Sequence, residues 1–308
     1  MNPTACNEFA ARVVESFGRR VVVADAQGKR EPAEMFGKRI SCVCGDDVLV
    51  RAAASNNDVA RVIKVEQRRS LFARTDSRGR TEPLAANLTV LAVLVAPQPE
   101  PDFFMIDRYL AGAALASVES FLLVNKADLP SDDSFSRSVG EYAAAGYTVM
   151  SISAKKLDSV VELQTRLHDQ LAMLVGQSGV GKSTLTNLLA PASARQTRTL
   201  SDSTQEGRHT TVSTAMFQLP TGGELIDSPG VRDYAPPLVE DAMVQVGWKE
   251  IMAAAPNCRF NNCLHLREPG CAVTAAVAAN EISPRRYESY KRLVNIMRGL
   301  APEYERRR

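Results

Sequence analysis

A phosphate-binding motif in the middle of the chain leaves few folds open to it. Residues 174–188 read LVGQSGVGKSTLTNL and contain the pattern G-x-x-x-x-G-K-S/T as Gly176, Gly181, Lys182 and Ser183. An apolar run precedes the motif and an amphipathic segment follows it, which is the strand–loop–helix context that a P-loop requires. Glycines let backbone N–H groups turn towards a phosphate, and the following helix adds the positive end of its dipole. The sequence therefore predicts an α/β nucleotide-binding domain.

Each residue of the motif has an expected role. Lys182 should reach the β- and γ-phosphates and so take part in catalysis, and the hydroxyl of Ser183 should bind Mg²⁺. The remaining residues expected to contact the nucleotide are Gly176, Gln177, Ser178, Gly179, Val180, Gly181 and Thr184. The alternative is a glycine-rich turn without a ligand, and the Lys-Ser pair at this spacing argues against it.

Two short motifs upstream of the P-loop indicate that the base is guanine. One apolar run ends in Asn125-Lys126-Ala127-Asp128, and a second ends in Ser153-Ala154-Lys155. The Asp128 carboxylate can accept from both N1–H and N2–H₂ of guanine, a pair of donors that adenine does not offer. The Ala154 N–H can donate to O6, and the stem of Lys126 can lie over the base. Either motif alone is weak, but both stand at strand ends in the usual order and spacing, so the candidate base-reading residues are Asn125, Lys126, Asp128, Ser153, Ala154 and Lys155.

The base-reading motifs precede the P-loop here, whereas in an ordinary GTPase they follow it. The stretch from Asn125 to Gly230 therefore predicts a GTPase domain in circularly permuted order. An α/β sheet tolerates this rearrangement, because strand neighbours fix its sites and ends that lie close in space can be rejoined. We expect the rejoining element to be a helix at Leu157–Leu171, which has apolar residues at helical spacing.

The segment after the P-loop helix should respond to the γ-phosphate. Residues 191–211 are polar, and a hydroxyl near their end, from Thr210 or Thr211, should close on Mg²⁺ when the γ-phosphate is present. Asp227 and Gly230 belong to an Asp-Ser-Pro-Gly motif at the end of an apolar strand. We expect Asp227 to hold the Mg²⁺ shell and the Gly230 N–H to reach the γ-phosphate.

Many GTPases place a water-orienting glutamine directly after that glycine. Here the residue is Val231, which cannot orient water. Either a partner completes the site or another side chain replaces the glutamine. His209 is our catalytic candidate for that replacement, because it lies in the first switch and titrates near neutral pH.

Near the C-terminus, four soft ligands stand within fourteen residues as Cys258-x₄-Cys263-x-His265-x₅-Cys271. Three thiolates and one imidazole suit a closed tetrahedral zinc site and exclude Mg²⁺ or Ca²⁺. The sequence therefore predicts one structural Zn²⁺, with free packed thiols as the alternative. Ser283-Pro284 then begins a helix. We expect its arginines to lie away from its packing face, where they could contact RNA.

The first 95 residues contain short β-rich runs separated by turn residues, which suits a small barrel. Strands are expected at Arg20–Ala24, Arg39–Cys44, Asp47–Arg51, Val59–Val65 and Leu88–Val95. Prolines at 97, 99 and 101 mark a linker, and Asp102 should cap a helix at Phe103–Ala116. We expect the barrel to attach near the base-reading strands.

The chain resembles the ribosome small-subunit-dependent GTPase A family (RsgA, also called YjeQ), a family of circularly permuted bacterial GTPases. The resemblance covers nearly the whole sequence and includes Ala85-Ala86-Asn87, Ile106-Asp107-Arg108-Tyr109 and Glu268-Pro269-Gly270-Cys271. It implies an OB-fold barrel at residues 1–95, a permuted P-loop GTPase domain at 96–245 and a zinc-binding helical domain at 246–308. It also implies the same zinc ligands, rRNA contacts by the flanking domains, and GTP hydrolysis stimulated by the small ribosomal subunit during its late maturation.

Composition sets weaker limits on function. A chain of 308 residues has room for two or three domains, and its net charge of +2 is too small to argue for nucleic acid by itself. We find no signal peptide and no apolar run of about 18–20 residues, so we expect a cytoplasmic, monomeric protein without a membrane partner. Two alternatives stay open. One is a P-loop ATPase, and the other is an RNA-binding assembly protein whose nucleotide site is vestigial or only regulatory.

Overall fold

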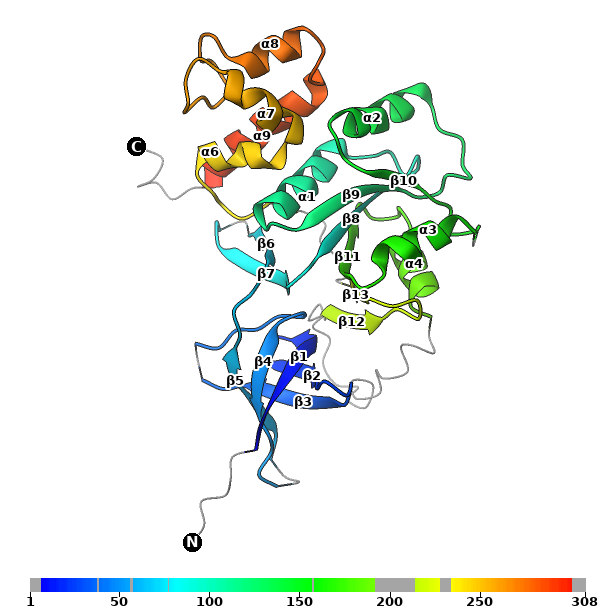
Figure 1. Cartoon of the computed structure of the whole chain (residues 1–308), viewed down its shortest axis with the longest axis vertical. Helices are drawn as coiled ribbons and strands as arrows, with labels where there is room; N and C mark the ends of the chain where they lie inside the picture. Colours follow the sequence, from blue (N-terminus) through cyan, green and yellow to red (C-terminus); the bar gives the residue numbers. More distant parts are fainter. Residues whose placement is uncertain are drawn as a thin grey trace.

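A parallel sheet that ends in the phosphate-binding loop lies at the centre of the molecule (Figure 1). The computed structural model describes residues 7–37, 39–55, 58–76, 78–156, 158–191, 214–227 and 234–300. The N-terminal barrel and the C-terminal helical module lie at opposite ends of the molecule, with the α/β domain between them. Within the described part of the chain, no helix is long and apolar enough to cross a membrane.

The central domain has the strand order expected for a permuted GTPase. Its strands, in spatial order, are β10 (Val149–Ser151), β9 (Glu119–Val124), β8 (Val90–Val95), β11 (Leu171–Gly176), β13 (Glu224–Asp227) and β12 (Thr214–Gln218). All neighbours are parallel except β12, which is antiparallel to β13. The base-reading strands β9 and β10 therefore lie on one side of the P-loop strand β11, and β13 lies on the other side.

Helices cover both faces of this sheet. Helices α1 (Phe103–Leu115) and α2 (Asp133–Ala144) pack on one face, and α3 (Asp158–Leu167) and α4 (Lys182–Leu189) pack on the other. Asp102 caps α1 as expected, since its carboxylate accepts from the Met105 N–H at 3.0 Å. The connecting helix α3 is also confirmed, although it ends at Leu167, and Leu171 is the first residue of β11 instead.

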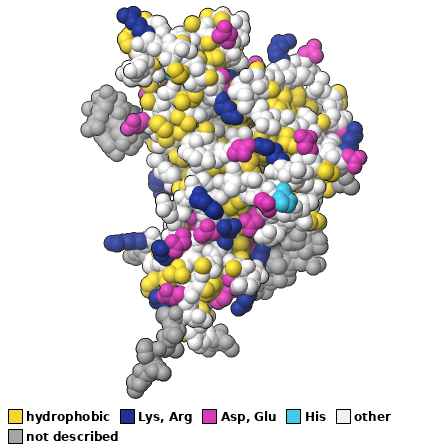
Figure 2. Space-filling view, viewed as in Figure 1, with side chains coloured by type: hydrophobic (Ala, Val, Ile, Leu, Met, Phe, Trp, Pro, Cys, Tyr) yellow, Lys and Arg dark blue, Asp and Glu magenta, His cyan; other side chains and the backbone are white. Residues whose placement is uncertain are grey.

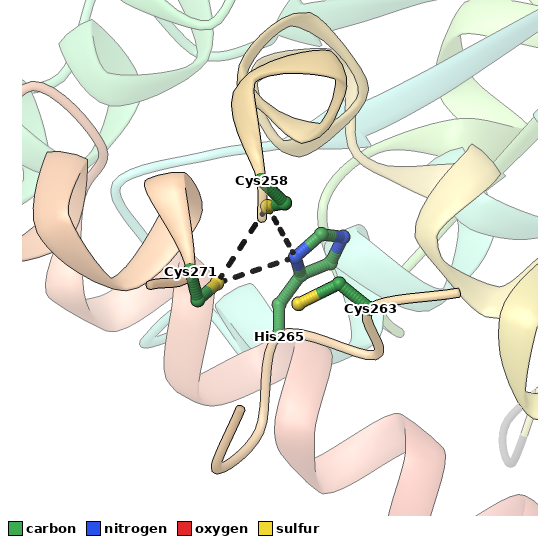
Figure 3. Close-up of side chains that lie close together, drawn as sticks. All are labelled: Cys258, Cys263, His265 and Cys271. Carbon is green, nitrogen blue, oxygen red and sulfur yellow. Dashed lines mark hydrogen bonds between the residues drawn. The ribbon is translucent and has the colours of Figure 1, made fainter. Parts of the chain in front are cut away.

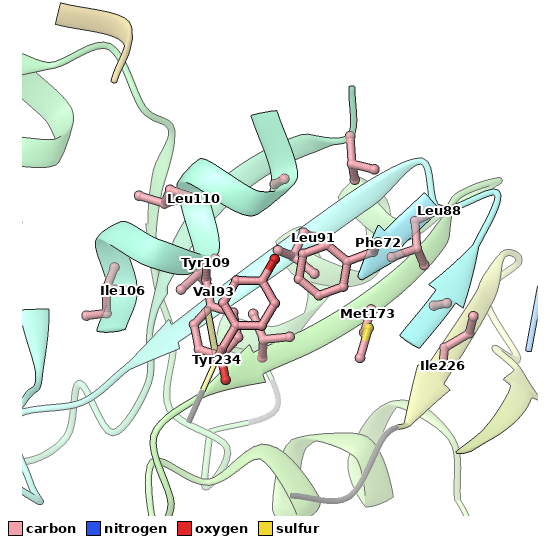
Figure 4. Close-up of a cluster of buried hydrophobic side chains, with 14 of the residues drawn as sticks. Phe72, Leu88, Leu91, Val93, Ile106, Tyr109, Leu110, Met173, Ile226 and Tyr234 are labelled. Atoms are coloured by element: carbon pink, nitrogen blue, oxygen red, sulfur yellow. The ribbon is translucent and has the colours of Figure 1, made fainter. Parts of the chain in front are cut away.

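Strand β8 lies in the parallel sheet and not in the barrel, which corrects the assignment of Leu88–Val95 to the barrel. All its residues are buried, and its register places it between β9 and β11. Leu91, Val93 and Val95 face the α1–α2 side, while Val90, Ala92 and Leu94 face the α3–α4 side. Figure 4 shows Leu91 and Val93 in the cluster beneath α1. An unbroken apolar run is typical of a parallel strand covered on both faces, whereas a barrel strand usually alternates apolar and polar residues.

Five strands form the closed N-terminal barrel. They are β1 (Glu8–Phe17), β2 (Arg20–Ala24), β3 (Arg30–Met35), β5 (Ala60–Val65) and β4 (Asp47–Arg51), and β4 pairs back to β1. The strands expected at 20–24, 47–51 and 59–65 are therefore confirmed within a residue, whereas 39–44 is not a strand. Cys42 and Cys44 in that segment are buried free thiols that pack in the protein interior.

Strand β1 also joins the barrel to the GTPase sheet, which corrects the expected attachment near the base-reading strands. Its last residues pair with β12 at Glu15↔Ala215 and Ser16↔Thr214. Arg12 strengthens the junction, because its guanidinium contacts Asp47 of the barrel at 2.8 Å and Glu224 of β13 at 2.9 Å. Acidic and basic side chains are interspersed across this junction in Figure 2. The barrel is thus attached to the strand that follows residues 192–213, which include the expected first switch.

Tyr234 anchors the chain that leaves the Asp227 segment. Its ring is fully buried between Phe72 and Tyr109, with ring centroids 5.1 and 4.7 Å away (Figure 4). Its hydroxyl donates to the Ala73 carbonyl at 3.1 Å. Phe72 and Ala73 belong to β6 (Leu71–Thr75), which forms a separate hairpin with β7 (Thr81–Ala86). The hairpin and α1 therefore hold the start of the connection to the C-terminal module in place.

The C-terminal module is helical and packs on α1. Its elements are α6 (Asp241–Val244), η1 (Gln245–Gly247), α7 (Lys249–Ala254), η2 (Ala255–Asn257), α8 (Ala272–Ala278) and α9 (Pro284–Leu300). Trp248 is fully buried in the module core against Tyr290 of α9. Gly247 lies so close to α1 that a Cβ there would come within 2.5 Å of the Ala111 Cβ. The same core includes Phe104 and Ala111 of α1, so the module and the GTPase domain share apolar packing.

A buried ion network fixes the module to α1, and it corrects the expectation that the arginines of the last helix face outward. Arg286 is 1% exposed and contacts Asp107 of α1 at 2.6 Å and Glu250 of α7. Arg285 contacts Asp107 at 3.1 Å and Glu141 of α2 at 2.6 Å. Burial alone would lower the pKa of Arg286, but the charge of Asp107 and the hydrogen bond with Glu250 outweigh it and raise that pKa. Both arginines hold the module in place and are not available to RNA.

We expect Asp107→Asn to destabilise the module by about 3–5 kcal/mol, because the change leaves buried arginine charge without its partner. Trp248 is the only tryptophan of the chain and lies in the module core, so its fluorescence during urea unfolding measures this loss. The matched control is Arg298→Gln, which removes a half-exposed ion pair with Asp241 and should cost less than about 1 kcal/mol. Equal shifts in the two variants would contradict the network's role.

Candidate nucleotide site and metal centre

The P-loop follows β11 and leads directly into α4, and its glycines are required by close backbone approaches. Gly176 has φ 145°, and a Cβ there would lie 2.4 Å from the Leu94 carbonyl oxygen of β8. Gly181 has φ 98°, and a Cβ there would lie 2.4 Å from Nδ2 of Asn125. A side chain at either glycine would therefore push the loop away from β8 or from Asn125.

Lys182 lies over the loop from the first turn of α4. Its ammonium donates to the carbonyls of Gly176 and Gln177 at 2.7 and 2.8 Å. Burial lowers the pKa of Lys182, and the charge of Asp227 partly opposes that effect. Ser183 follows on the same turn and is exposed. A poorly hydrated ammonium beside an exposed hydroxyl suits a phosphate and the cation bound to it.

The base-reading segment touches the P-loop directly, although more than fifty residues separate the two in sequence. Nδ2 of Asn125 donates to the Val180 carbonyl at 2.9 Å, and Asn125 is 1% exposed. The Lys126 ammonium donates to the Gly179 carbonyl at 2.7 Å and to the Gln98 carbonyl at 2.9 Å. The structure therefore brings the expected base-reading and phosphate-binding residues into one site.

Asp128 is held in place by residues of the Ser-Ala-Lys motif. Its carboxylate accepts from the Ser153 hydroxyl at 2.7 Å and from the Lys155 ammonium at 3.1 Å. These two hydrogen bonds, that of Ser153 first, lower the pKa of Asp128, so the carboxylate is ionised at neutral pH. The Ala154 N–H points at Oδ1 of Asn125 at 3.4 Å. A fixed carboxylate and a neighbouring backbone donor form the pair that recognition of guanine needs.

Gln177 has a side-chain role that the motif does not reveal. Its Oε1 accepts from the Asp102 N–H at 3.0 Å, and its Nε2 donates to the Glu100 carbonyl at 3.0 Å. The residues expected to be a simple linker thus pack along the P-loop, and Gln177 ties them to the start of α1. The sequence contains no signal for this contact, because the second position of the P-loop pattern accepts any residue.

Asp227 ends β13 beside the P-loop strand, since Met173 and Ile226 pair in the parallel register. Its carboxylate therefore lies at the same edge of the sheet as Ser183, and the two residue types suit Mg²⁺. The remaining expected site residues, His209, Thr210, Thr211 and Gly230, lie outside the described residues.

The four expected zinc ligands converge in the C-terminal module (Figure 3). Their ligand atoms all lie within 4.8 Å of one another. Sγ of Cys258 and Sγ of Cys271 are 3.9 Å apart. Nδ1 of His265 lies 3.5 Å from Sγ of Cys258 and 3.4 Å from Sγ of Cys271. Zn–S bonds of about 2.3 Å and Zn–N bonds of about 2.0 Å in a tetrahedron give separations of about 3.8 and 3.5 Å. The residues therefore fit a zinc ion, with Cys263 as the fourth ligand.

Other side chains orient the zinc ligands. Nε2 of His265 lies 2.8 Å from the side-chain amide oxygen Oε1 of Gln245, which fixes the proton on Nε2 and leaves Nδ1 free for the metal. The Glu268 carboxylate accepts from the backbone N–H groups of Leu264, Leu266 and Arg267. Burial would raise the pKa of Glu268, but these hydrogen bonds lower it to about 2. Glu268 thus folds the loop that carries His265, a role that its place in the motif did not reveal.

Comparisons with known proteins agree with this site. Residues 65–236, more than half of the chain, match the RsgA GTPase family. Two relatives named small ribosomal subunit biogenesis GTPase RsgA, from Azotobacter vinelandii and Pseudomonas aeruginosa (strain LESB58), are 37% and 36% identical. The matches cover 95% and 94% of this chain and 86% of each relative.

Solved structures show the same architecture. YjeQ from Thermotoga maritima matches with a TM-score of 0.73 at 25% identity, covering 94% of this chain and 99% of that one. YloQ, described as a circularly permuted GTPase, matches with a TM-score of 0.72 at 22% identity, covering 99% and 100%. The family match over residues 65–236 and the 37% identity over nearly the whole chain therefore show that the chain belongs to the RsgA GTPase family.

Proposed function

We propose that this protein hydrolyses GTP, binds the small ribosomal subunit and assists the late maturation of that subunit, which in turn stimulates hydrolysis. The observation that supports this proposal most strongly is the direct contact of Asn125 and Lys126 with the P-loop carbonyls. That contact brings the segment expected to read guanine and the segment expected to bind phosphate together. The names of the relatives support the choice of partner, since both are small ribosomal subunit biogenesis GTPases.

Within this proposal, the residues divide the work between base, phosphate and metal. Asp128 and the Ala154 N–H read the base, the P-loop amides and Lys182 bind the phosphates, and Ser183 and Asp227 hold Mg²⁺. The bound Mg²⁺ would neutralise charge on the β- and γ-phosphates. Thr210 or Thr211 would complete the Mg²⁺ shell, Gly230 would contact the γ-phosphate, and His209 would orient water. Intrinsic turnover should be slow, because Val231 cannot orient water, and the subunit would complete the site.

The flanking parts of the chain would recognise rRNA. We propose the barrel (strands β1 to β5) and the zinc module (246–308) as the RNA-contacting parts around the GTPase domain, which includes β8 and ends near residue 245, in a monomeric protein of the cytoplasm. The rival proposal of an RNA-binding assembly protein with a vestigial site has less support, because Lys182, Ser183 and Asp227 are all present. Co-sedimentation with purified small subunits in GTP-analogue and GDP states would test the partner.

The choice of base can be tested by replacing one carboxylate oxygen of Asp128 with an amide group. We expect Asp128→Asn to weaken GTP binding by about a hundredfold. The variant should favour xanthosine triphosphate (XTP), because the C2 oxygen of xanthine can accept a hydrogen bond from the new amide. Loss of a charged hydrogen-bonded partner costs about 1.5–3 kcal/mol, and about 1.4 kcal/mol is tenfold in affinity. Competition binding with GTP, ATP and XTP measures the change, with Asp133→Asn at the start of α2 as a control. Equal affinity of the parent protein for ATP and GTP would favour the ATPase alternative instead.

A further inference from the structure

The loop between the first two zinc ligands exposes an aromatic ring. Cys258 and Cys263 enclose the sequence Arg-Phe-Asn-Asn, and Phe260 within it is 41% exposed. The loop is held by more than the metal ligands. The Arg259 N–H donates to the Gly270 carbonyl at 3.1 Å, and the Cys263 N–H donates to the Phe260 carbonyl at 3.2 Å. The ring is therefore presented to solvent by a fixed backbone.

The charges around this ring favour an anionic partner. The Arg259 guanidinium lies 5.4 Å from the centroid of the Phe260 ring. Within the described residues Arg259 has no ion pair with a carboxylate, unlike Arg285, Arg286 and Arg298 of the same module. Its charge is therefore available to a phosphate, whereas the charges of those three arginines are already neutralised.

A small hollow lies beside the ring. It has a volume of about 220 Å³ and is lined by Met252, Pro256, Phe260 and Asn261, by the zinc ligands Cys263 and His265, and by Gln245, which orients His265. The described residues that line it include no carboxylate. Sites that enclose a whole small molecule usually measure about 300–1,000 Å³. The hollow is therefore of a size for one planar group, and its walls carry both apolar and polar atoms, the Asn261 amide among them.

We propose that Phe260 is a stacking platform for one unpaired nucleobase of RNA, that Arg259 binds the adjacent phosphate, and that Asn261 contacts the base edge. This inference rests on the proposed function, because it names the part of the module that meets rRNA. Bases in single-stranded segments stack on aromatic rings, while basic side chains bind their backbone. Zinc contributes by fixing both ends of the loop, which reduces the conformational entropy lost on binding.

A second exposed phenylalanine explains why the platform is placed on the zinc loop. Phe36 of the barrel is 51% exposed, and the Arg61 guanidinium lies 5.8 Å from its ring centroid. Arg61, however, also pairs with Asp58 at 3.4 Å, so its charge is shared. In the Arg259–Phe260 pair the ring is 41% exposed, and the guanidinium that lies over one face of the ring has no carboxylate partner among the described residues.

The test separates stacking from simple apolar contact. We would measure the binding of the full-length protein to a 5′-labelled, single-stranded RNA of mixed sequence by fluorescence anisotropy at two salt concentrations. Phe260→Leu keeps apolar surface but removes the ring, so its Kd should rise about tenfold, which corresponds to about 1.4 kcal/mol and lies within the range for one stacked base. Phe260→Trp should bind like the parent protein. Arg259→Gln should reduce the slope of log Kd against log salt concentration by about the amount that one phosphate contact contributes.

The control is Val161→Ala, which removes an exposed apolar side chain from α3, on the opposite face of the GTPase sheet from α1, where the module packs. It should leave RNA binding unchanged. Zinc content, measured for every variant, and Trp248 fluorescence, measured for every variant except Phe260→Trp, show that the module is folded. If Phe260→Leu binds RNA like the parent, or if the parent does not bind the RNA, the platform is wrong. Tight subunit binding by Phe260→Leu but not by Phe260→Asp would identify an apolar protein contact instead and would overturn the RNA assignment.

Failure of the platform and failure of the proposed function give different results. GTP turnover with small subunits, measured in parallel, reports the proposed function without depending on Phe260. A parent protein that the subunits stimulate, together with unchanged RNA binding by Phe260→Leu, removes only the platform. A parent protein that the subunits neither bind nor stimulate removes the proposed function and the platform with it.

Discussion

Lys182→Ala should lower the intrinsic rate of GTP hydrolysis by at least about a hundredfold. Removing one preorganised charge from the developing transition state typically costs about 10²–10³ in rate. Lys182 is such a charge, because it is half-buried, held above the P-loop and poorly hydrated. Phosphate release under single-turnover conditions measures the chemical step without interference from GDP release.

A surface lysine provides the comparison for this variant. Lys64→Ala removes an ammonium that is 60% exposed in the barrel and pairs with Glu66. It should leave intrinsic hydrolysis within about twofold of the parent rate, since exposed ion pairs contribute little. If Lys182→Ala also hydrolyses GTP at the parent rate, the P-loop is not the catalytic site and the function proposed here is wrong.

Cys263→Ser should abolish zinc binding and unfold the C-terminal module. Structural zinc contributes about 10–16 kcal/mol of binding free energy that is available only when its ligands converge, so losing one thiolate removes most of it. Elemental analysis should fall from one zinc per chain to almost none, and Trp248 should become exposed to solvent. Nucleotide binding should change little, because the zinc ligands lie in the C-terminal module, whose core packs on Phe104 and Ala111 of α1.

Another buried cysteine separates this effect from the general cost of losing a thiol. Cys42 is 2% exposed in the barrel and lies outside the zinc cluster. Cys42→Ser should keep one zinc per chain and the parent Trp248 fluorescence. Full zinc content in Cys263→Ser, or no zinc in freshly purified parent protein, would contradict the zinc assignment.

The sequence predicted the elements whose signals are local. The P-loop, the helix capped by Asp102 and the four zinc ligands follow from spacing and capping rules within a few residues. The barrel was harder, because its strands β1 and β3 are defined by their partners rather than by their own composition. Strand β3 contains Pro32 and two glutamates, and β1 reaches β12 across some two hundred residues of sequence. Strand pairings of this kind cannot be predicted from one amino-acid sequence, because they depend on the partner strand.

The candidate site shows the same division. The sequence correctly predicted that the Asn125-Lys126 segment and the P-loop would share a site, because motifs at the carboxyl ends of parallel strands meet at one edge of a sheet. It did not predict the contacts of Gln177 with the start of α1. It also placed Arg286 on an outer face, since a charged residue in a helix is usually exposed. Arg286 can be buried only because the fold brings Asp107 of α1 and Glu250 of α7 against it.

The most direct test of the account is GTP turnover by the full-length protein with and without purified small ribosomal subunits. The protein alone should turn GTP over slowly, because Val231 stands where many GTPases have a water-orienting glutamine. Purified subunits should raise that turnover rate at least about tenfold. Lys182→Ala, measured with the same subunits, should show only the background rate. The same rate of GTP turnover with and without subunits, or equal stimulation of ATP hydrolysis, would contradict the proposed function.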